Sequence, residues 1–396
     1  MAILNKSFPY INVNLRDDDQ QIDYRTDSIY IQLDHWNDHD YWYCEIFMGE
    51  CFYKYKIETL ISSDILNKIK TDDNTFLVIC NSHEAFHSIV GPIYKTLIIE
   101  SKIPAKKIIL MSESADLCLA VKKVADNLHQ EYVNVLWATA FQHGMKLDKK
   151  NIDKSQIEPA ETLTSKSYPK KFINLNRRWR LHRPVTVALL KCLNLLEYGY
   201  VSISQDINLE TMGLTWANTY EWMIKRYNYD PINLNLIKSN MNEITDMPDM
   251  YVDTTDLKTN RAILTDSTDY YYANSLFSLV SETNFYNDSR QGGGRFLSEK
   301  TFKPIAKRHP FIIITVPRTL ELIRSIGYKT FHPWINEDYD LELDDDLRLN
   351  KILKEVERIC HLTDSEVEEF LINVRPIVEH NYTILMNKEI NLRKML

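Results

Sequence analysis

The sequence of 396 residues has only nine glycines and no long apolar segment. No stretch approaches the roughly 20 apolar residues that a membrane-spanning helix needs, so we expect no membrane span. The first ten residues carry neither an apolar core nor a small-residue cleavage site, which is untypical of a secretory signal. The length suits two domains, and we expect a cytoplasmic protein.

The six cysteines are far apart, and no two form a C-x-x-C pair. This spacing excludes a zinc ribbon and a disulfide framework, and it suits a reducing compartment. The phosphate loop G-x-x-x-x-G-K-[ST], the dinucleotide motif G-x-G-x-x-G and the motifs H-E-x-x-H and G-x-S-x-G are also missing. The D-x-D strings at residues 38–40 and 338–340 do not close a predicted strand. We therefore expect no metal and no cofactor.

Basic residues are unevenly distributed. The net charge of −8 argues against a uniformly basic nucleic-acid-binding surface. Residues 162–196 nevertheless contain no acidic side chain, residues 290–308 contain one, and residues 337–346 hold seven carboxylates. Two basic islands in an acidic protein indicate a site for a concentrated anion such as a diphosphate.

Short apolar runs alternate with helix-like segments along most of the chain. This pattern predicts two α/β domains, each with a parallel sheet between helices. We place the first domain at residues 1–155, a polar linker at 156–170 and the second domain, with a helical tail from Asp345, at 171–396. The predicted strands are residues 29–55 (as short strands), 75–80, 107–111, 132–137, 171–175, 200–203, 276–280, 311–315 and 328–331. Ligands of such sheets bind at the carboxyl ends of the strands.

Residues 275–315 contain the most informative pattern. The predicted strand ends in S-E-T, which directs Glu282 toward the ligand edge. Ser298 is placed to cap the following helix, which leaves backbone N–H groups free to meet an anion. Lys300, in the first turn, adds an ammonium to the same anion. The glycines at residues 292–294 suit a mobile loop that closes over a ligand.

This segment resembles the donor-binding signature of the α-1,3-fucosyltransferase family. S-E-T corresponds to the family's E-N-S, F-L-S-E-K-T-F-K-P-I to its Y-x-T-E-K and helix, and H-P-F-I-I-I to its following strand. The resemblance implies the GT-B fold, in which two Rossmann-like domains face each other across a cleft, and it implies no catalytic metal. Thr283 and Asn284 stand where the family has Asn-Ser, so the donor sugar and nucleotide stay open.

The resemblance also implies roles for single residues. Glu299 would meet the donor ribose, Lys300 the diphosphate, and Glu282 would lie beside the donor. In that family an arginine after the first strand of the C-terminal domain contacts phosphate. The arginines at that place are Arg177 and Arg180, with Arg183 next. An arginine suits this role because its planar fork binds two phosphate oxygens.

Transfer with inversion needs a base to deprotonate the acceptor hydroxyl, and we expect that base in the N-terminal domain. The candidates at strand ends are His83, Glu84 and Glu113. Further candidates are His143, Asp34, His35 and Asp38.

The sequence therefore predicts a hexosyl- or pentosyltransferase that uses a nucleoside diphosphate sugar. We expect a glycan acceptor; the alternative is a hydroxymethylated base in DNA, as in phage enzymes. DNA would need basic residues beside aromatic stackers, whereas Trp36 and Trp42 are accompanied by Asp34 and Asp38. A non-catalytic nucleotide-sugar-binding protein and a sugar-nucleotide enzyme such as an epimerase are further alternatives. A composition rich in Asn, Ile, Lys and Tyr fits a viral or low-GC bacterial source, and the oligomeric state stays open.

Overall fold

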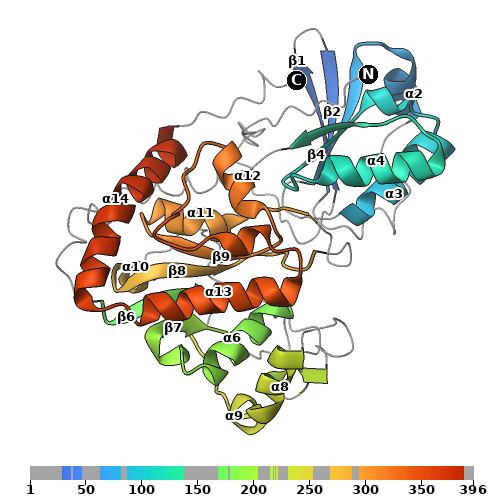
Figure 1. Ribbon diagram of the computed structural model, residues 1–396. Coiled ribbons are helices and arrows are strands. Elements are labelled where there is room, and N and C mark those ends of the chain that lie inside the picture. The colour runs from blue at the N-terminus through green and yellow to red at the C-terminus, as the bar shows by residue number, and fades with distance from the viewer. Residues whose placement is uncertain are drawn as a thin grey trace. The chain divides into compact units, whose positions relative to one another are not determined.

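The computed structural model divides into two compact units (Figure 1). It describes residues 29–36, 39–46, 63–81, 87–137, 168–176, 179–203, 215, 216, 218, 220, 221, 231–252, 268–287 and 294–387. Unit 1 takes the described residues up to 137 together with 294–297, and unit 2 takes the others. No helix in these described ranges is long and apolar enough to cross a membrane.

Unit 1 contains a five-stranded sheet in the order β1-β2-β3-β4-β5. Its first two strands are antiparallel and the others are parallel. The strands are β1 (Ile29–Trp36), β2 (His39–Ile46), β3 (Thr75–Asn81), β4 (Ile108–Ser112) and β5 (Asn134–Trp137). The connecting helices are α2 (Ser63–Thr71), η2 (His87–Ile89), α3 (Val90–Ile93), η3 (Tyr94–Glu100), η4 (Ala105–Lys107) and α4 (Leu117–Leu128). Parallel strands require such crossovers, and the predicted alternation is confirmed here.

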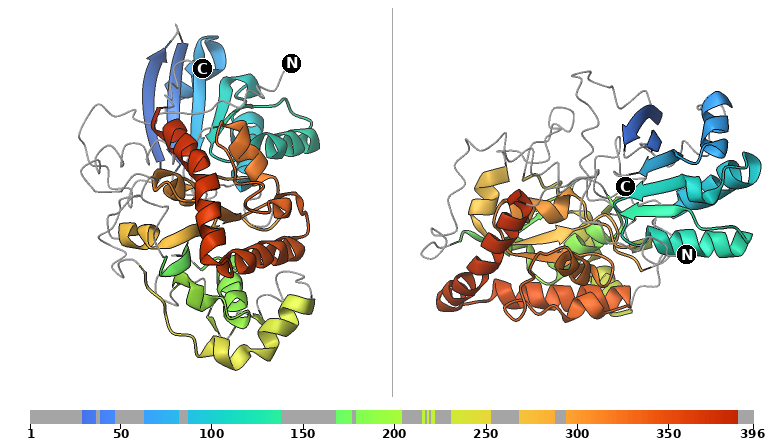
Figure 2. Two further views of the ribbon diagram at one scale, coloured as in Figure 1. Left: turned by 60° about the vertical axis from the view of Figure 1, so that its left-hand side comes forward. Right: turned by 90° about the horizontal axis from the view of Figure 1, so that it is seen from above.

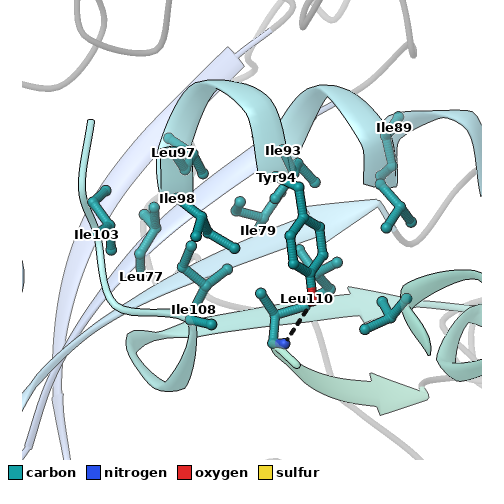
Figure 3. Close-up of a cluster of buried hydrophobic side chains, with 14 of the residues drawn as sticks. Leu77, Ile79, Ile89, Ile93, Tyr94, Leu97, Ile98, Ile103, Ile108 and Leu110 are labelled. Atoms are coloured by element: carbon teal, nitrogen blue, oxygen red, sulfur yellow. Dashed lines mark hydrogen bonds between the residues drawn. The ribbon is translucent and has the colours of Figure 1, made fainter. Parts of the chain in front are cut away.

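The core of unit 1 lies between the sheet and its helices (Figure 3). Alternate strand residues share one face, so Leu77 and Ile79 of β3 lie beside Ile108 and Leu110 of β4. The α2, α3, η3 and α4 segments bury their apolar side chains against this face. The short apolar runs read from the sequence are therefore strands that are buried by helices.

Tyr94 adds a hydroxyl to this apolar core. The side chain is fully buried, and its hydroxyl donates to the Glu131 carbonyl oxygen (3.0 Å) and accepts from the Val133 N–H (3.1 Å; Figure 3). We expect Tyr94→Phe to lower the free energy of unfolding by about 1–2 kcal/mol, because it leaves the buried Val133 N–H without this acceptor. Urea unfolding of the variant measures this change.

Tyr132 supplies the matched control for this prediction. Its hydroxyl bonds the Asp126 carboxylate at 2.6 Å, but the side chain is 39% exposed. Water replaces that hydrogen bond, so Tyr132→Phe should change stability by less than about 0.5 kcal/mol. Equal losses in the two variants would contradict the assignment of the Tyr94 hydroxyl to a buried, water-excluded bond.

Unit 2 contains a four-stranded parallel sheet in the order β7-β6-β8-β9. The strands are β6 (Lys170–Leu175), β7 (Gly199–Ser202), β8 (Ser275–Ser281) and β9 (Phe311–Ile314). Every residue of β8 is buried, as expected for a central strand covered on both faces. Because all four strands run the same way, the segments that follow β6 and β8 start from the same edge of the sheet. The described structure thus confirms two α/β units with largely parallel sheets.

Helices surround the second sheet (Figure 1). They are α6 (His182–Cys192), η6 (Leu196–Tyr198), α8 (Pro231–Ser239), α9 (Met241–Thr245), α10 (Asp269–Ala273), α11 (Glu299–Ala306), α12 (Thr319–Ser325), η9 (Asp338–Leu341), α13 (Asp345–Cys360) and α14 (Asp364–Asn387). Helix α13 packs on β6 and β9, and the long α14 packs on α11 (Figure 2). The predicted helical tail from Asp345 is confirmed.

The predicted strand at residues 328–331 is wrong. This segment is an irregular connection in which Tyr328 and Phe331 are buried. The Lys329 N–H donates to Asn381 Oδ1 (2.7 Å), and Asn381 Nδ2 donates to the Lys329 carbonyl (2.8 Å). An asparagine side chain of α14 therefore satisfies backbone groups that a neighbouring strand would otherwise pair.

The predicted domain boundaries stay a prediction. Residues 156–167 of the proposed linker lie outside the described residues, and β6 already begins at Lys170. Residues 294–297 belong to unit 1, although the sequence analysis assigned them to the C-terminal domain.

Candidate functional site

Glu282 connects the end of β8 to the start of α11. Its side chain is fully buried. Oε1 accepts from the Ser298 N–H (3.0 Å) and the Thr301 hydroxyl (2.6 Å). Oε2 accepts from the Ser298 hydroxyl (2.7 Å) and the Thr283 N–H (2.8 Å). The carboxylate therefore holds together the end of β8 and the start of α11, which are separated in the sequence by more than ten residues.

Ser298 is the N-cap of α11, as the sequence predicts. It has extended backbone, and its Oγ accepts from the Lys300 N–H at 3.3 Å. At this helix start the Ser298 N–H is taken by Glu282 and the Lys300 N–H by the cap. The expected contact of a ligand anion with backbone N–H groups stays a prediction. The buried Glu282 carboxylate is itself the anion at the helix N-terminus.

Lys300 and Glu299 form an ion pair at the start of α11. Nζ of Lys300 lies 2.6 Å from Oε1 of Glu299 and 3.2 Å from Oγ of Ser298. The two charged side chains keep 25% and 27% of their surface exposed. An ammonium has three N–H donors. Since two of them face these oxygens, the third has no protein partner within the described ranges.

Burial acts to raise the pKa of Glu299, but the ammonium groups of Lys300 and Lys303 outweigh it and lower the pKa to about 2. Glu299 is therefore a carboxylate at every physiological pH. It can accept hydrogen bonds from hydroxyl groups without first losing a proton.

Arg180 and Arg183 approach the same strand end from the segment that follows β6. Arg183 is buried, and its Nη2 donates to the carbonyls of Ser281 (3.4 Å) and Glu282 (3.3 Å). Arg180 is half-buried, and its Nη1 donates to the Thr283 carbonyl (3.4 Å). Arg183 thus binds the strand end, whereas Arg180 keeps part of its surface in solvent.

His182 belongs to this group, and the sequence analysis did not identify it. The side chain is fully buried, its ring stacks on Phe285, and Nε2 donates to the Glu282 carbonyl at 2.9 Å. Burial lowers the pKa of His182 well below its usual range, and the neighbouring Arg183, Arg180 and Lys300 add to the shift. The ring is therefore neutral. In the sequence, only its place between Arg180 and Arg183, two residues before Pro184, pointed to it.

We call these residues the carboxyl-edge cluster. Its cations are Arg180, Arg183, Lys300 and Lys303, and its carboxylates are Glu282 and Glu299. Counted over these described residues, four cations and two carboxylates leave an excess of two positive charges, since His182 is neutral. Such an excess at the carboxyl edge of a parallel sheet favours an anionic ligand.

The other predicted site residues do not join this cluster. Arg177, His83 and Glu84 lie outside the described residues, as does His143. Glu113 follows β4 as expected, but its side chain is 0% exposed. Its role as the base stays a prediction, as do those of His83 and Glu84. Among the described residues, no group of His, Cys, Asp and Glu side chains is arranged to hold a metal ion.

Residues 294–297 lie against the loop that follows β4 in unit 1. The Asp116 carboxylate accepts two hydrogen bonds from Arg295. Its Oδ1 accepts from the guanidinium Nη2 (2.6 Å), and its Oδ2 accepts from the backbone N–H (2.7 Å). The Arg295 carbonyl accepts from the Ala115 N–H (2.9 Å), and Phe296 forms an antiparallel bridge with Ser114. Two side-chain and two backbone contacts therefore dock this segment, which leads directly to Ser298.

Gly294 begins the docked segment with a φ of +90°. A Cβ there would lie 2.8 Å from Cε1 of His87 and 2.9 Å from Cβ of Asp116. We expect Gly294→Ala to lower the free energy of unfolding by about 1–3 kcal/mol, because both the backbone conformation and the space require glycine. Thermal unfolding measures the effect.

Gly91 is the matched control. It lies in α3, and a Cβ there would meet no atom within 4 Å. Gly91→Ala should be neutral or stabilise by up to about 1 kcal/mol, since it restricts the unfolded chain. A Gly294→Ala protein as stable as Gly91→Ala would show that the docked conformation is not required.

No family model and no curated protein matches the chain. A search of solved structures finds similarity to a UDP-forming α,α-trehalose-phosphate synthase from Burkholderia xenovorans, with 9% identity over 90% of this chain and 88% of that chain and a TM-score of 0.37. A structure described as the enzyme of that organism in complex with glucose-6-phosphate gives 7% identity, coverage of 91% and 89%, and a TM-score of 0.35. Both TM-scores lie below 0.5.

Proposed function

We propose that the protein is a glycosyltransferase that binds a nucleoside diphosphate sugar at the carboxyl-edge cluster and transfers the sugar to a hydroxyl acceptor. The observation that carries this proposal is the excess of two positive charges at the carboxyl edge of the second sheet. A diphosphate diester carries one negative charge on each phosphate, so it balances this excess. The two α/β units fit the GT-B fold that the donor motif implies.

Three partly exposed side chains contact the donor in this proposal. Lys300 directs its remaining N–H to a phosphate oxygen, and Arg180 binds the diphosphate beside it. Glu299, ionised because of its lysine neighbours, accepts from the ribose hydroxyls. As the diphosphate leaves, the fixed cations stabilise its developing charge, which is the role that a metal ion has in other transferases.

Other members of the cluster hold these groups in place. Glu282 binds the cap of α11, and Arg183 and His182 bind the carbonyls at the end of β8. All three are buried, so we assign them to positioning and not to donor contact. This differs from the role that the donor motif implies for Glu282.

For the acceptor we propose a glycan. In the register of β1 and β2, Asp34 lies opposite Tyr41, and His35 opposite Asp40. Strands that combine aromatic residues with carboxylates suit pyranose rings better than a nucleic-acid backbone, which carries negative charge.

A thermal-shift screen with GDP, UDP, CDP, ADP, dTDP and their sugars tests the proposal. A ligand at about 100 times its dissociation constant stabilises the folded protein by roughly 2.7 kcal/mol. We expect one nucleotide family to raise the unfolding temperature, and the matching nucleotide sugar to release its diphosphate slowly in water. If none of the nucleotides shifts the transition, the donor assignment is wrong.

A further inference from the structure

Arg318 lies at the carboxyl edge of the second sheet, in the segment that follows β9. Two hydrogen bonds join the ends of β8 and β9 there. The Glu282 N–H donates to the Ile314 carbonyl (3.0 Å), and the Thr315 hydroxyl donates to the Asn284 carbonyl (3.2 Å). Arg318 is three residues beyond Thr315, so the Cα atoms of these two residues are at most roughly 11 Å apart. All of these residues belong to unit 2, as does the carboxyl-edge cluster.

The backbone of Arg318 has a left-handed conformation, with a φ of 62° and a ψ of 20°. Four other non-glycine residues within the described ranges have a positive φ, and each lies within two residues of the end of a helix: Lys102, His129, Asn194 and Arg308. Helices commonly end in this conformation. Arg318 instead stands directly before the start of α12, so the ending of a helix does not explain its strained backbone.

Capping of α12 does not explain this arginine either, because its side chain makes no capping hydrogen bond. Asp340 of η9 serves as the cap, since its carboxylate accepts from the N–H groups of Leu320 (2.9 Å) and Glu321 (3.3 Å). The Asp340 carbonyl also accepts from the Arg318 N–H at 2.6 Å. Asp340 therefore occupies N–H groups at the helix start and holds the Arg318 backbone in place, which leaves the arginine side chain as the group that a ligand meets here.

The Arg318 side chain is 62% exposed. Its Nη1 lies 3.6 Å from Oε2 of Glu321, whose side chain is 55% exposed, and the guanidinium makes no hydrogen bond to the part of the chain that the structure describes. An exposed pair of this kind contributes little to stability. Neither packing nor pairing thus accounts for an arginine with this backbone. Strained residues that their surroundings hold in place are concentrated at ligand-binding sites.

We propose that Arg318 is a further donor-binding residue, whose guanidinium contacts the nucleobase; this inference rests on the proposed function. Lys300 and Arg180 balance the two charges of the diphosphate, whereas Glu321 offsets the charge of Arg318, so this pair suits an uncharged group. The planar fork of an arginine donates to two acceptors on the edge of a base. Neighbouring strands are about 4.8 Å apart. A nucleotide bound at the start of α11, beside the end of β8, therefore reaches the segment that follows β9.

Arg318→Gly separates ligand binding from folding. Glycine adopts a positive φ without strain, so the unliganded variant should unfold at the wild-type temperature or above it. The dissociation constant for the nucleoside diphosphate should rise about 10-fold, while that for inorganic pyrophosphate, which has no base, should not change. The measurement is the thermal shift of the full-length protein at several concentrations of pyrophosphate, and of whichever of GDP, UDP, CDP, ADP and dTDP stabilises the wild type most.

Two further variants keep the test decisive. Lys102 is exposed, has a φ of 57° and follows η3 in unit 1, so Lys102→Gly relieves the same kind of backbone strain and should leave both ligand responses as in wild type. Arg318→Lys keeps the charge but not the planar fork. Its affinity for the nucleotide should stay reduced, and a lysine variant with wild-type affinity would overturn the contact with the base.

The results distinguish the two proposals. A wild type that neither pyrophosphate nor any of the nucleotides stabilises refutes the proposed function and with it the role of Arg318. A normal wild-type shift together with unchanged nucleotide affinity in Arg318→Gly refutes the role of Arg318 alone. Equal losses of pyrophosphate and nucleotide binding would place Arg318 at the phosphates and not at the base. A lower unfolding temperature of unliganded Arg318→Gly would show that the arginine serves the fold, against the proposal.

Discussion

Lys300→Ala should abolish most of the nucleotide-induced stabilisation while leaving the unliganded fold intact. Its ammonium bonds Glu299 and the cap Ser298 and keeps one donor for a phosphate oxygen. A hydrogen bond to a charged group contributes about 1.5–3 kcal/mol, so the dissociation constant should rise about 10- to 100-fold. Thermal shifts at several nucleotide concentrations measure this change.

The loss of Lys300 should also be visible without any ligand. In the wild type the pKa of Glu299 is depressed from 4.5 to about 2, so its ion pair stabilises the fold above pH 4.5 and loses this effect as the pH falls toward 2. Removing the ammonium raises that pKa, so the variant should lose less stability over this acidic range. Unfolding temperatures measured from pH 2 to 7 show the difference.

Lys351 is the matched control for both measurements. Lys351 lies on α13, outside the carboxyl-edge cluster, and its Nζ donates to Oε2 of Glu342 at 2.7 Å. Lys351→Ala removes the same kind of exposed pair, at a cost of about 1 kcal/mol or less, and should not change nucleotide binding. If the two lysine variants respond equally to nucleotide, the diphosphate is not held at the start of α11.

Glu282→Ala should destabilise the protein by about 3–5 kcal/mol. The change removes a fully buried carboxylate that accepts four hydrogen bonds, and it leaves donors of Ser298, Thr301 and Thr283 buried without it. Glu282→Gln keeps the shape but brings an NH₂ group against these donors, so we expect a smaller loss. Urea unfolding followed by circular dichroism measures both.

Glu366 provides the comparison for Glu282. Its carboxylate accepts from the N–H and hydroxyl of Thr363 at 2.8 and 2.7 Å, but on the exposed start of α14. Because water replaces those bonds, Glu366→Ala should cost about 1 kcal/mol or less. A Glu282→Ala protein that is as stable as Glu366→Ala and still binds nucleotide would contradict the positioning role.

The features of this fold that depend only on residues close together in the sequence could be predicted from it. The apolar runs of β3, β4 and β8 fell where they were expected, because strands buried on both faces need an uninterrupted apolar sequence. Ser298 as the cap of α11 is also local, since the cap bonds an N–H two residues away. The basic islands likewise predict an anion site, because charge is counted without knowing the fold.

The details of the site were decided by residues far apart in the chain. Glu282 bonds Ser298 across 16 positions of the chain. The sequence predicts a ligand-facing side chain, and only the way in which β8 and α11 meet shows that Glu282 is buried and bonds the helix cap. His182 reaches the Glu282 carbonyl across 100 positions, and His87 reaches Ser114 across 27. Side chains meet at these separations because parallel strands align their carboxyl ends, and no local pattern records which ones. The sequence by itself determined most of the elements and their charge; tertiary contact decided which charged groups are buried and which stay partly exposed.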